Sequence, residues 1–455
     1  MLAPAPSVPG PDALLTPLAP GAAYAADVAR LNGRAPIGAA DDAWLALAQV
    51  LARAAELPVR ERARVLAAGG RTLTALVPAD APAPVRNALG AAGAALGTLG
   101  DALGRGVARR AARDAAEVGE VHAAVDALQG AVAQAEQAGA FLLAFSTLAA
   151  ARGALAPVLD RRAEGLVLAQ QGRVARQVGA LVMAAELYAQ SVRAARAARA
   201  PDVLARALIG RGALASMRGN YPEARTLFRR GLRLADRVGA EEHRRAAHHG
   251  LLLAALIAGD SEAALAHGWE AFQSLPDSAT DARAEMLVNM GDAGRRVGEY
   301  RASIGAFLTA IELTDNARIV LPALGGAALA AAQLGDEKLL TIVVRAVERT
   351  VGRSGQVWEE ARALVEVAEA YELLRDTRAL FFAERAETLA RSGPFHEISA
   401  RAENVRASWA TARASTDVRR SAGASWSAGT RTVLAALENM PATAPSTALS
   451  ACGVP

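Results

Sequence analysis

Residues 208–232 read LIGRGALASMRGNYPEARTLFRRGL, and this stretch decides the fold. Its small and apolar residues recur at helical spacing on two successive segments: Leu208, Gly212 and Ala215, then Ala224, Phe228, Gly231 and Leu232. Between the segments, Gly219 can take the positive φ that ends a helix, and Pro222 suits the first turn of the next helix. The stretch therefore predicts two antiparallel helices that approach closely through their small residues.

The glycine of this turn recurs along the chain at a nearly constant interval. The recurring glycines are Gly139, Gly179, Gly219, Gly259, Gly298 and Gly335. Successive steps are 40, 40, 40, 39 and 37 residues, and a further step of 40 arrives at Arg375, in a segment with the same pattern. Because self-similarity at a fixed period indicates a repeat protein, we expect six or seven helix pairs between about Asp126 and Ala400.

The residues around each of these glycines repeat together with it. Further copies contain Gly172, Ala175, Leu181, Ala184 and Tyr188; Leu252, Ala255, Ala264 and Ala271; and Leu287, Gly291, Gly294, Tyr300, Ser303, Phe307 and Ala310. This pattern resembles the tetratricopeptide repeat, although the first-helix Trp of that family is absent from these copies and the period is 40 rather than 34 residues. The resemblance implies an all-α fold, a right-handed α-solenoid of antiparallel helix pairs. An unrelated α-solenoid with the same two-helix unit is the alternative.

Four regions are expected along the chain. They are a disordered segment at 1–40, a divergent helical region at 41–124 that could hold degenerate repeats, the repeat array at 125–400, and a capping helix with a flexible tail at 401–455. Within the second region, a helix is predicted from Asp41 and a weak repeat around Gly93 and Gly100. Leu434 and Leu437 predict one more short helix near the end of the chain.

Composition excludes several classes of protein. The chain has 50 Lys and Arg against 46 Asp and Glu, a net charge of +4, so its whole surface is not a nucleic-acid footprint. Apolar residues at 52% with aromatic residues at only 4% favour closely packed helices over β-sandwiches. The single cysteine, Cys452, excludes a disulfide framework and a thiolate zinc site. The N-terminus lacks the pattern of a secretory signal, and Pro322 interrupts the longest uncharged stretch, so we expect a cytoplasmic protein without a membrane span.

A search for catalytic or metal-binding patterns finds little. The sequence has neither a phosphate-binding glycine loop nor an HExxH pattern. His243, His248 and His249 cluster, but positions i and i+5 lie about 140° apart on a helix, which disfavours a shared metal. Adjacent carboxylates such as Glu359 and Glu360 point apart and indicate the start of a helix. We therefore expect no enzymatic activity, no cofactor and no metal.

By the family resemblance, the first helix of each pair lines a groove for a partner. Projected repeat by repeat, the expected groove residues are Arg173, Arg176, Ile209, Ser216, His249, Leu253, Leu256, Val288, Asn289, Asp292, Arg295, Glu369 and Glu372. Along the chain, the side chains of the projected groove change from basic, through apolar, to acidic. Some tetratricopeptide modules grip a partner's C-terminal carboxylates with Lys and Asn at fixed positions. Here the Lys positions hold Ala169, Ile209 and His249, so that clamp is not expected.

These features predict a non-enzymatic scaffold whose groove binds a peptide or a helix of a protein partner. The alternative is a partner-sensing module of a signalling or transcription-control system, which in this family usually carries an effector domain. Weak nucleic-acid binding through residues 193–245 comes third, because that segment holds thirteen Arg against five acidic residues, a net charge of +8. Residues 359–403 carry a net charge of −4. The sequence leaves the identity of the partner and the oligomeric state open.

Overall fold

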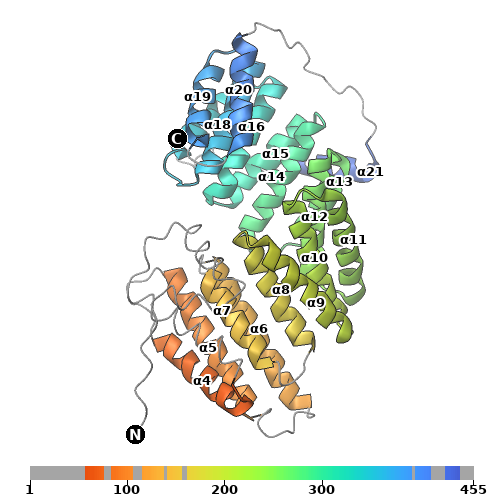
Figure 1. The fold of residues 1–455 in the computed structure, drawn as a ribbon. Coiled ribbons are helices and arrows are strands. Elements are labelled where there is room, and N and C mark those ends of the chain that lie inside the picture. Colours follow the sequence, from red (N-terminus) through yellow and green to blue (C-terminus); the bar gives the residue numbers. More distant parts are fainter. Residues whose placement is uncertain are drawn as a thin grey trace. The chain divides into compact units, whose positions relative to one another are not determined.

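A computed structural model of the chain describes residues 57–75, 83–105, 115–137, 141–155, 161–391, 395–410 and 426–440. Within these residues the fold is all-α, with eighteen helices and no strand (Figure 1). Sequential helices pack against each other from α4 to α11 and from α13 to α20. The predicted helix at Asp41 and the predicted disordered segment at 1–40 lie outside the described residues.

The chain divides into two compact units, Met1–His243 and Arg244–Pro455, and this division falls inside the predicted array at 125–400. The first unit contains α4 (Val59–Ala75), α5 (Ala83–Arg105), α6 (Ala115–Gln137), α7 (Phe141–Leu155), α8 (Arg161–Gln177), α9 (Leu181–Ala197), α10 (Pro201–Met217), α11 (Tyr221–Val238) and the start of α12 (Glu241–Ala258). The second unit contains the rest of α12, then α13 (Ser261–Gln273), α14 (Thr280–Arg296), α15 (Tyr300–Leu313), α16 (Ala317–Leu334), α17 (Glu337–Thr350), α18 (Val357–Leu373), α19 (Arg378–Ala390), α20 (His396–Ala410) and α21 (Ala428–Glu438). We call the even-numbered helices from α6 to α20 first helices, and the odd-numbered helices from α7 to α19 second helices.

The turns between first and second helices confirm the predicted glycine positions. The ladder glycines with positive φ are Gly179 at 79°, Gly219 at 75°, Gly259 at 74°, Gly298 at 85° and Gly335 at 81°. Arg375, where the sequence offers no glycine, also takes a positive φ of 56°. The backbone of this turn is therefore kept even where an arginine must adopt a conformation that side chains disfavour. Gly139 lies outside the described residues.

A polar residue directly after the turn starts many of the second helices. The side chains of Asn220, Asp260 and Asp336 each accept a hydrogen bond from the backbone N–H three residues ahead. This N-cap satisfies one of the backbone donors that the first turn of a helix leaves free. At these three turns a positive φ ends one helix and a short polar side chain begins the next.

Aromatic side chains on second helices pack directly on glycines of first helices. A Cβ added at Gly212 would lie 2.8 Å from the Phe228 ring, and one added at Gly291 would lie 2.8 Å from the Phe307 ring. A Cβ at Gly172 would likewise lie 3.0 Å from the Tyr188 ring. In each case the ring is sixteen residues after the glycine. The aromatic ring of one helix thus occupies the space that a side chain on its partner would need.

The pair α12 and α13 reverses this arrangement. At the equivalent positions the first helix carries Leu252 and the second helix carries Gly268. A Cβ at Gly268 would lie 3.5 Å from Leu252 Cδ1, and it would also approach Met290 Cγ at 2.6 Å. The large and small members of the pair thus exchange helices, and the tight contact at Gly268 is made with Met290 of α14 rather than with the paired helix.

Glycines also bring α4 and α5 together in the first unit. Gly93 and Gly100 were expected to mark a weak repeat, but both lie inside α5 rather than at a turn. A Cβ at Gly100 would lie 2.7 Å from the Ala63 carbonyl oxygen, and one at Gly93 would lie 2.7 Å from the Gly70 carbonyl oxygen. The two helix backbones therefore touch, which explains the glycines without a repeat boundary.

Helix α16 is the apolar centre of the second unit. Its eighteen residues, from Ala317 to Leu334, are long and apolar enough to cross a membrane, and among the described helices none other passes that test. In the structure 72% of this helix is buried, where it packs against α14, α15, α17 and α18. Pro322 lies inside the helix and is buried with it.

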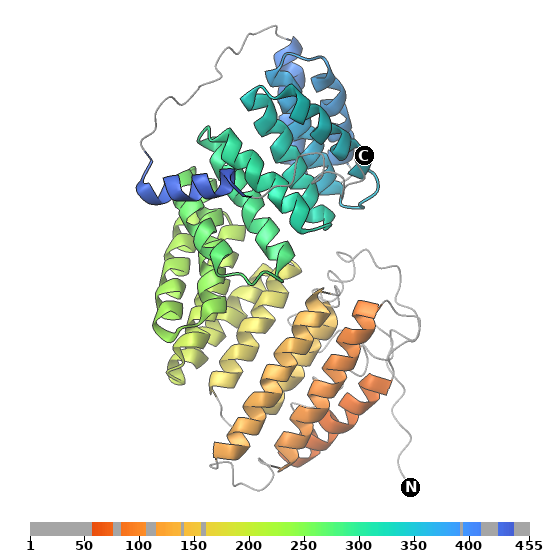
Figure 2. The ribbon, with the colours of Figure 1, turned by 180° about the vertical axis from the view of Figure 1, so that it is seen from behind.

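The last helix, α21, packs on second helices far earlier in the chain. It contacts α13 and α15 (Figure 2). Trp426 Nε1 donates a hydrogen bond of 3.0 Å to Glu299, and Thr430 Oγ1 donates one of 2.8 Å to Glu262. Gly305 leaves room for the backbone of Leu437. The predicted short helix is thus present, and it packs on α13 and α15.

Candidate partner-binding face

The predicted groove residues lie on five first helices: α8, α10, α12, α14 and α18. Leu253 is exposed, and ten others are half-buried. Leu256 and Val288 are only 7% and 6% exposed and belong to the core, so these two side chains are not open to a partner. The four groove residues on α8 and α10 belong to the first unit, and the other nine belong to the second.

An exposed apolar strip lies on α12. Leu253 is 38% exposed and Ile257, one helical turn further, is 54% exposed. His249, one turn before Leu253, is half-buried, and its Nε2 atom lies 3.7 Å from Glu285 Oε1. Burial lowers the pKa of His249, and the Glu285 carboxylate opposes this shift. The imidazole of His249 and two exposed aliphatic side chains therefore share one side of this helix.

A set of paired charges connects three first helices of the second unit. This balanced network consists of Asp292 and Arg295 on α14, Arg362, Glu366 and Glu369 on α18, and Arg401 on α20. Arg362 bridges Asp292 and Glu366 with N–O distances of 3.0 Å each. Arg401 donates two hydrogen bonds, of 2.8 and 2.7 Å, to the Glu369 carboxylate. Three cations thus face three anions.

Glu366 is the buried member of the balanced network. A Cβ added at Gly325 of α16 would run into its carboxylate, so this glycine makes the space for it. Burial raises the pKa of Glu366, with Arg362 opposing the shift. The pKa of Arg362 is raised in turn, chiefly by the Glu366 charge. Arg362 therefore stabilises the charged form of Glu366, and Glu366 stabilises the charged form of Arg362.

A second polar cluster crosses first helices α6, α8 and α10 in the first unit. This arginine cluster consists of Glu136, Arg173, Arg176 and Arg206, with the amides of Gln129 and Gln170. Arg173 lies 3.0 Å from Glu136, whose side chain is buried. Arg206 donates to Gln170 and, at 2.9 Å, to Gln129. Within the cluster three arginines surround the carboxylate of Glu136, and Glu242 at the start of α12 also acts on Arg206.

Several members of these two networks were not predicted from the sequence. Arg206 and Arg362 lie at the same place in the repeat, thirteen residues before the turn residue; the sequence marked Arg206 only as part of the basic segment 193–245 and did not mark Arg362. Glu136, Glu366 and Arg401 were missed as well. Their pairing depends on which first helices lie side by side, and a periodic pattern does not specify this.

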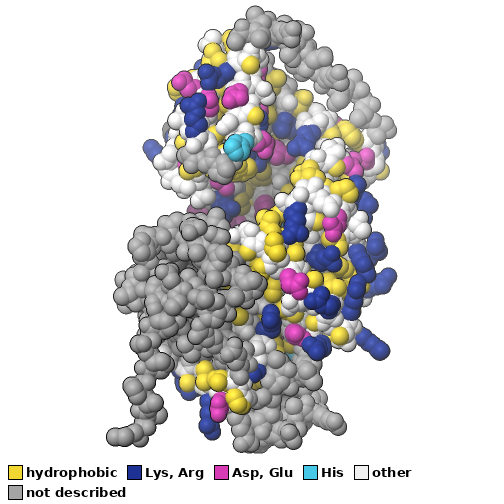
Figure 3. Space-filling model, viewed as in Figure 1, with side chains coloured by type: hydrophobic (Ala, Val, Ile, Leu, Met, Phe, Trp, Pro, Cys, Tyr) yellow, Lys and Arg dark blue, Asp and Glu magenta, His cyan; other side chains and the backbone are white. Residues whose placement is uncertain are grey.

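The outer side of the first unit is basic. Helix α11 carries Arg225, Arg229, Arg230, Arg233 and Arg237, all exposed, against Glu223 and Asp236. Figure 3 shows Lys and Arg side chains gathered along this edge. Within the part of the chain that the structure describes, none of the five is in an ion pair. These arginines lie on a second helix and so are separate from the predicted groove.

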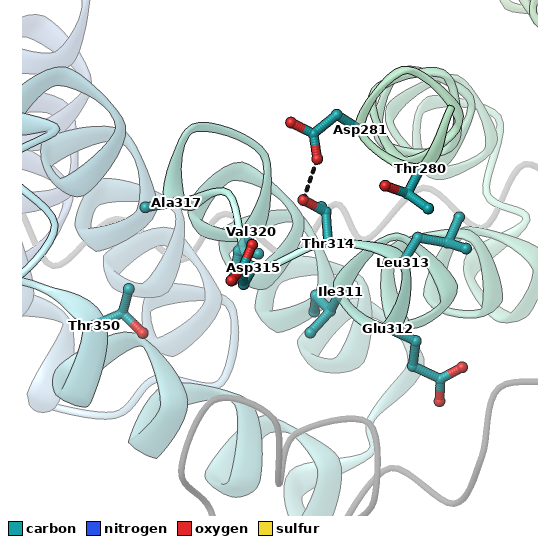
Figure 4. Close-up of a pocket in the computed structure, with 10 residues that line it drawn as sticks. All are labelled: Thr280, Asp281, Ile311, Glu312, Leu313, Thr314, Asp315, Ala317, Val320 and Thr350. Carbon is teal, nitrogen blue, oxygen red and sulfur yellow. Dashed lines mark hydrogen bonds between the residues drawn. The ribbon is translucent and has the colours of Figure 1, made fainter. Parts of the chain in front are cut away.

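A pocket of about 460 Å³ opens at the helix ends of the second unit (Figure 4). Its lining includes Asp281, Glu312 and Asp315 together with apolar side chains such as Ile311 and Val320. Asp281 accepts hydrogen bonds from Thr314 and, at 2.8 Å, from Asn316 Nδ2. Asn316 itself caps α16. The polar groups at this pocket therefore hold the turn between α15 and α16.

The histidines do not come together at one point. His248 Nδ1 lies 3.1 Å from His267 Nδ1, whereas His249 faces Glu285. Burial, followed by the nearby Arg206, lowers the pKa of His243. In the described ranges no group of three His, Cys, Asp or Glu side chains is placed to hold a metal ion.

No protein-family model matches this chain, and a comparison with curated protein sequences found no significant match.

Proposed function

We propose that the helix pairs form a long-period solenoid similar to the tetratricopeptide repeat. The positive-φ turns at a spacing close to 40 residues support this proposal. The glycine and aromatic contacts support it as well, because the same pair of positions recurs in three helix pairs and is reversed in a fourth. Stacked pairs of this kind present a row of first helices as one continuous surface.

On that basis we propose a scaffold that binds a segment of a protein partner on its first helices. The observation that carries the proposal is the exposed strip of Leu253 and Ile257 on α12. Leu253 lies six residues before its turn glycine; the same repeat position holds Arg173, Asp292 or Glu369 in three other copies and Ala213 or the buried Leu329 in two more. Leu253 is the exposed leucine at this position, since Leu329 is buried, and its exposure favours a partner contact in which apolar contact supplies affinity while neighbouring charges fix orientation.

Two other functions remain as alternatives. In a partner-sensing module, the bound segment would change the array and so control an effector. Nucleic-acid binding is favoured only by the five exposed arginines of α11, and few aromatic residues accompany them.

Placing negative charge on the apolar strip tests the scaffold proposal. We expect the double variant Leu253→Glu and Ile257→Glu to capture partner polypeptides at least tenfold less than the wild type, because charge replaces apolar contact there. Capture from a lysate of the source cells is quantified by mass spectrometry on the immobilised full chain. Circular dichroism checks that the helices remain.

The matched control is Val182→Glu. Val182 is an aliphatic residue on a second helix, α9, and is 83% exposed. The Val182→Glu variant should leave both partner capture and helix content unchanged. An unchanged set of captured polypeptides in the α12 double variant would contradict the proposal.

A further inference from the structure

Helix α21 joins two successive helix pairs of the second unit. It packs on α13 and α15, which are the second helices of the pairs α12–α13 and α14–α15 (Figure 2). Glu262 of α13 accepts hydrogen bonds from the backbone N–H of Ser427 at 3.2 Å and from Thr430 Oγ1 at 2.8 Å. Glu299, which directly precedes α15, accepts one of 3.0 Å from Trp426 Nε1. One short helix is therefore anchored to both pairs.

The apolar face of α21 is buried in the core of the second unit. Val433, Leu434 and Leu437 belong to the same apolar core as residues of α13 and α15. A Cβ added at Gly305 of α15 would run into the carbonyl oxygen of Leu437, so α15 carries no side chain where the backbone of α21 approaches it. Apolar burial and this close approach hold α21 in place together with the two carboxylate anchors.

Both anchors lie next to the turns that connect first and second helices. Glu262 comes three residues after Gly259, and Glu299 directly follows Gly298. Ile257 of the apolar strip is two residues before Gly259, at the end of α12 that enters the same turn. The docked α21 therefore ties the end of α12 that carries the strip to the corresponding end of α14.

The same two ends are also joined on the side of the first helices. Arg296, the last residue of α14, donates a hydrogen bond to the backbone carbonyl of Leu256 in α12. The angle between the two pairs is thus fixed by Arg296 between the first helices and by α21 between the second helices. In a stack of helix pairs, each pair contacts its neighbours, so this angle determines the local shape of the surface that the first helices form.

We propose that α21 is a brace that holds the two pairs at one angle and thereby maintains the partner surface around Leu253 and Ile257. The proposal rests on the proposed scaffold function, because it concerns the regulation of the same α12 strip. With α21 docked, the surface of α12 and α14 is preorganised for a partner. Without α21, the partner must order this surface as it binds, which lowers the affinity. Partner binding thus depends on a helix that comes far later in the chain.

Hydrogen exchange of the full chain without a partner, measured by mass spectrometry, tests the brace. Leu434→Asp with Leu437→Asp places two carboxylates on the buried face of α21 and should release it, because a buried charge without a partner is strongly unfavourable. We expect exchange to rise roughly fivefold or more in α21 and also at 252–258 of α12 and 290–297 of α14. A rise confined to α21 would overturn the proposal, and so would unchanged exchange in α21.

A second variant acts from α15 and guards against general unfolding. Gly305→Ala places a methyl group where the Leu437 carbonyl lies, while the higher helix propensity of alanine favours α15 itself. It should raise exchange at the same ends of α12 and α14. An effect of the two aspartates that Gly305→Ala does not reproduce would show general unfolding and would overturn the brace.

The matched control places two aspartates on the exposed face of α21, as Thr432→Asp with Ala435→Asp. We expect exchange at the ends of α12 and α14 to stay within about twofold of the wild type, because the docked face is unchanged. Equal effects of the buried and the exposed aspartates would show a response to charge rather than to docking and would contradict the proposal.

The dependence of the partner on α21 is measured with the same variants. Capture of the polypeptides that the α12 double variant loses should fall about fivefold when Leu434 and Leu437 are replaced by Asp, and it should persist in the control. Unchanged capture beside faster exchange in α12 would overturn this dependence. Because exchange is measured without a partner, it tests the brace even if the α12 double variant captures what the wild type captures, which is the outcome that contradicts the proposed function.

Discussion

Replacing Arg362 with methionine is expected to lower the free energy of unfolding of the second unit by about 3–5 kcal/mol. Arg362 bridges Asp292 and Glu366, and Glu366 is buried where Gly325 makes room for it. Without the guanidinium group, a buried carboxylate loses its principal partner, and this costs more than the ion pair contributes as a whole. Denaturant titration followed by circular dichroism measures the loss.

The same variant should be least destabilised at mildly acidic pH. Burial raises the pKa of Glu366, so its folded form binds a proton more readily than its unfolded form does. The ionised carboxylate of Glu366 therefore destabilises the folded variant as the pH rises, and protonation removes this destabilisation as the pH falls. Arg318→Met is the control, because Arg318 is 70% exposed and 3.6 Å from Glu359, a pair worth about 0–1 kcal/mol. Equal stability of the two variants would contradict the account of a buried network.

Gly212→Leu and Gly291→Leu are each expected to destabilise the chain by about 1–3 kcal/mol through overpacking. At both glycines even a Cβ would lie 2.8 Å from an aromatic ring of the paired helix, so the ring or the helix must shift. The control is Gly130→Leu in α6, where nothing lies within 4 Å of an added Cβ. There the higher helix propensity of leucine should raise stability by up to about 1 kcal/mol. Denaturant midpoints of the three variants that do not differ would refute the close packing of the pairs.

The turns and pairs were predictable from the sequence because each depends on residues close together in the chain. A turn glycine with a positive φ recurs in five described turns, and a ring that faces a glycine sixteen residues before it recurs in three helix pairs. Even Arg375, where the glycine is missing, was located by counting alone. Local chemistry repeated at one period therefore predicts the all-α fold and its sequential packing.

Side-chain burial within the groove was harder to predict. Leu256 and Arg176 both lie three residues before their turn glycines, yet the leucine is in the core while the arginine is half-buried. A long charged side chain keeps its polar end in water, and an aliphatic side chain at the same position turns inward. Equivalent positions therefore differ in exposure according to the residue that they hold.

Contacts between residues far apart in the chain do not appear in the sequence as a repeating pattern. The docking of α21 joins Trp426 to Glu299 and Thr430 to Glu262, across more than a hundred residues in each case. The bridge from Arg362 to Asp292 likewise spans seventy residues. Such pairings follow from which helices become neighbours, so a single sequence does not specify them.

Photo-crosslinking at one residue on each kind of helix tests the proposed binding face most directly. A benzophenone amino acid replaces Leu253 on α12 in one protein and Val182 on α9 in another, and both exposed positions carry an aliphatic residue in the wild type. After irradiation in the source lysate, polypeptide adducts are quantified by mass spectrometry. The proposal predicts a defined adduct at position 253 and none above background at position 182. Equal labelling at the two positions, or labelling at 182 alone, would contradict a partner site on the first helices.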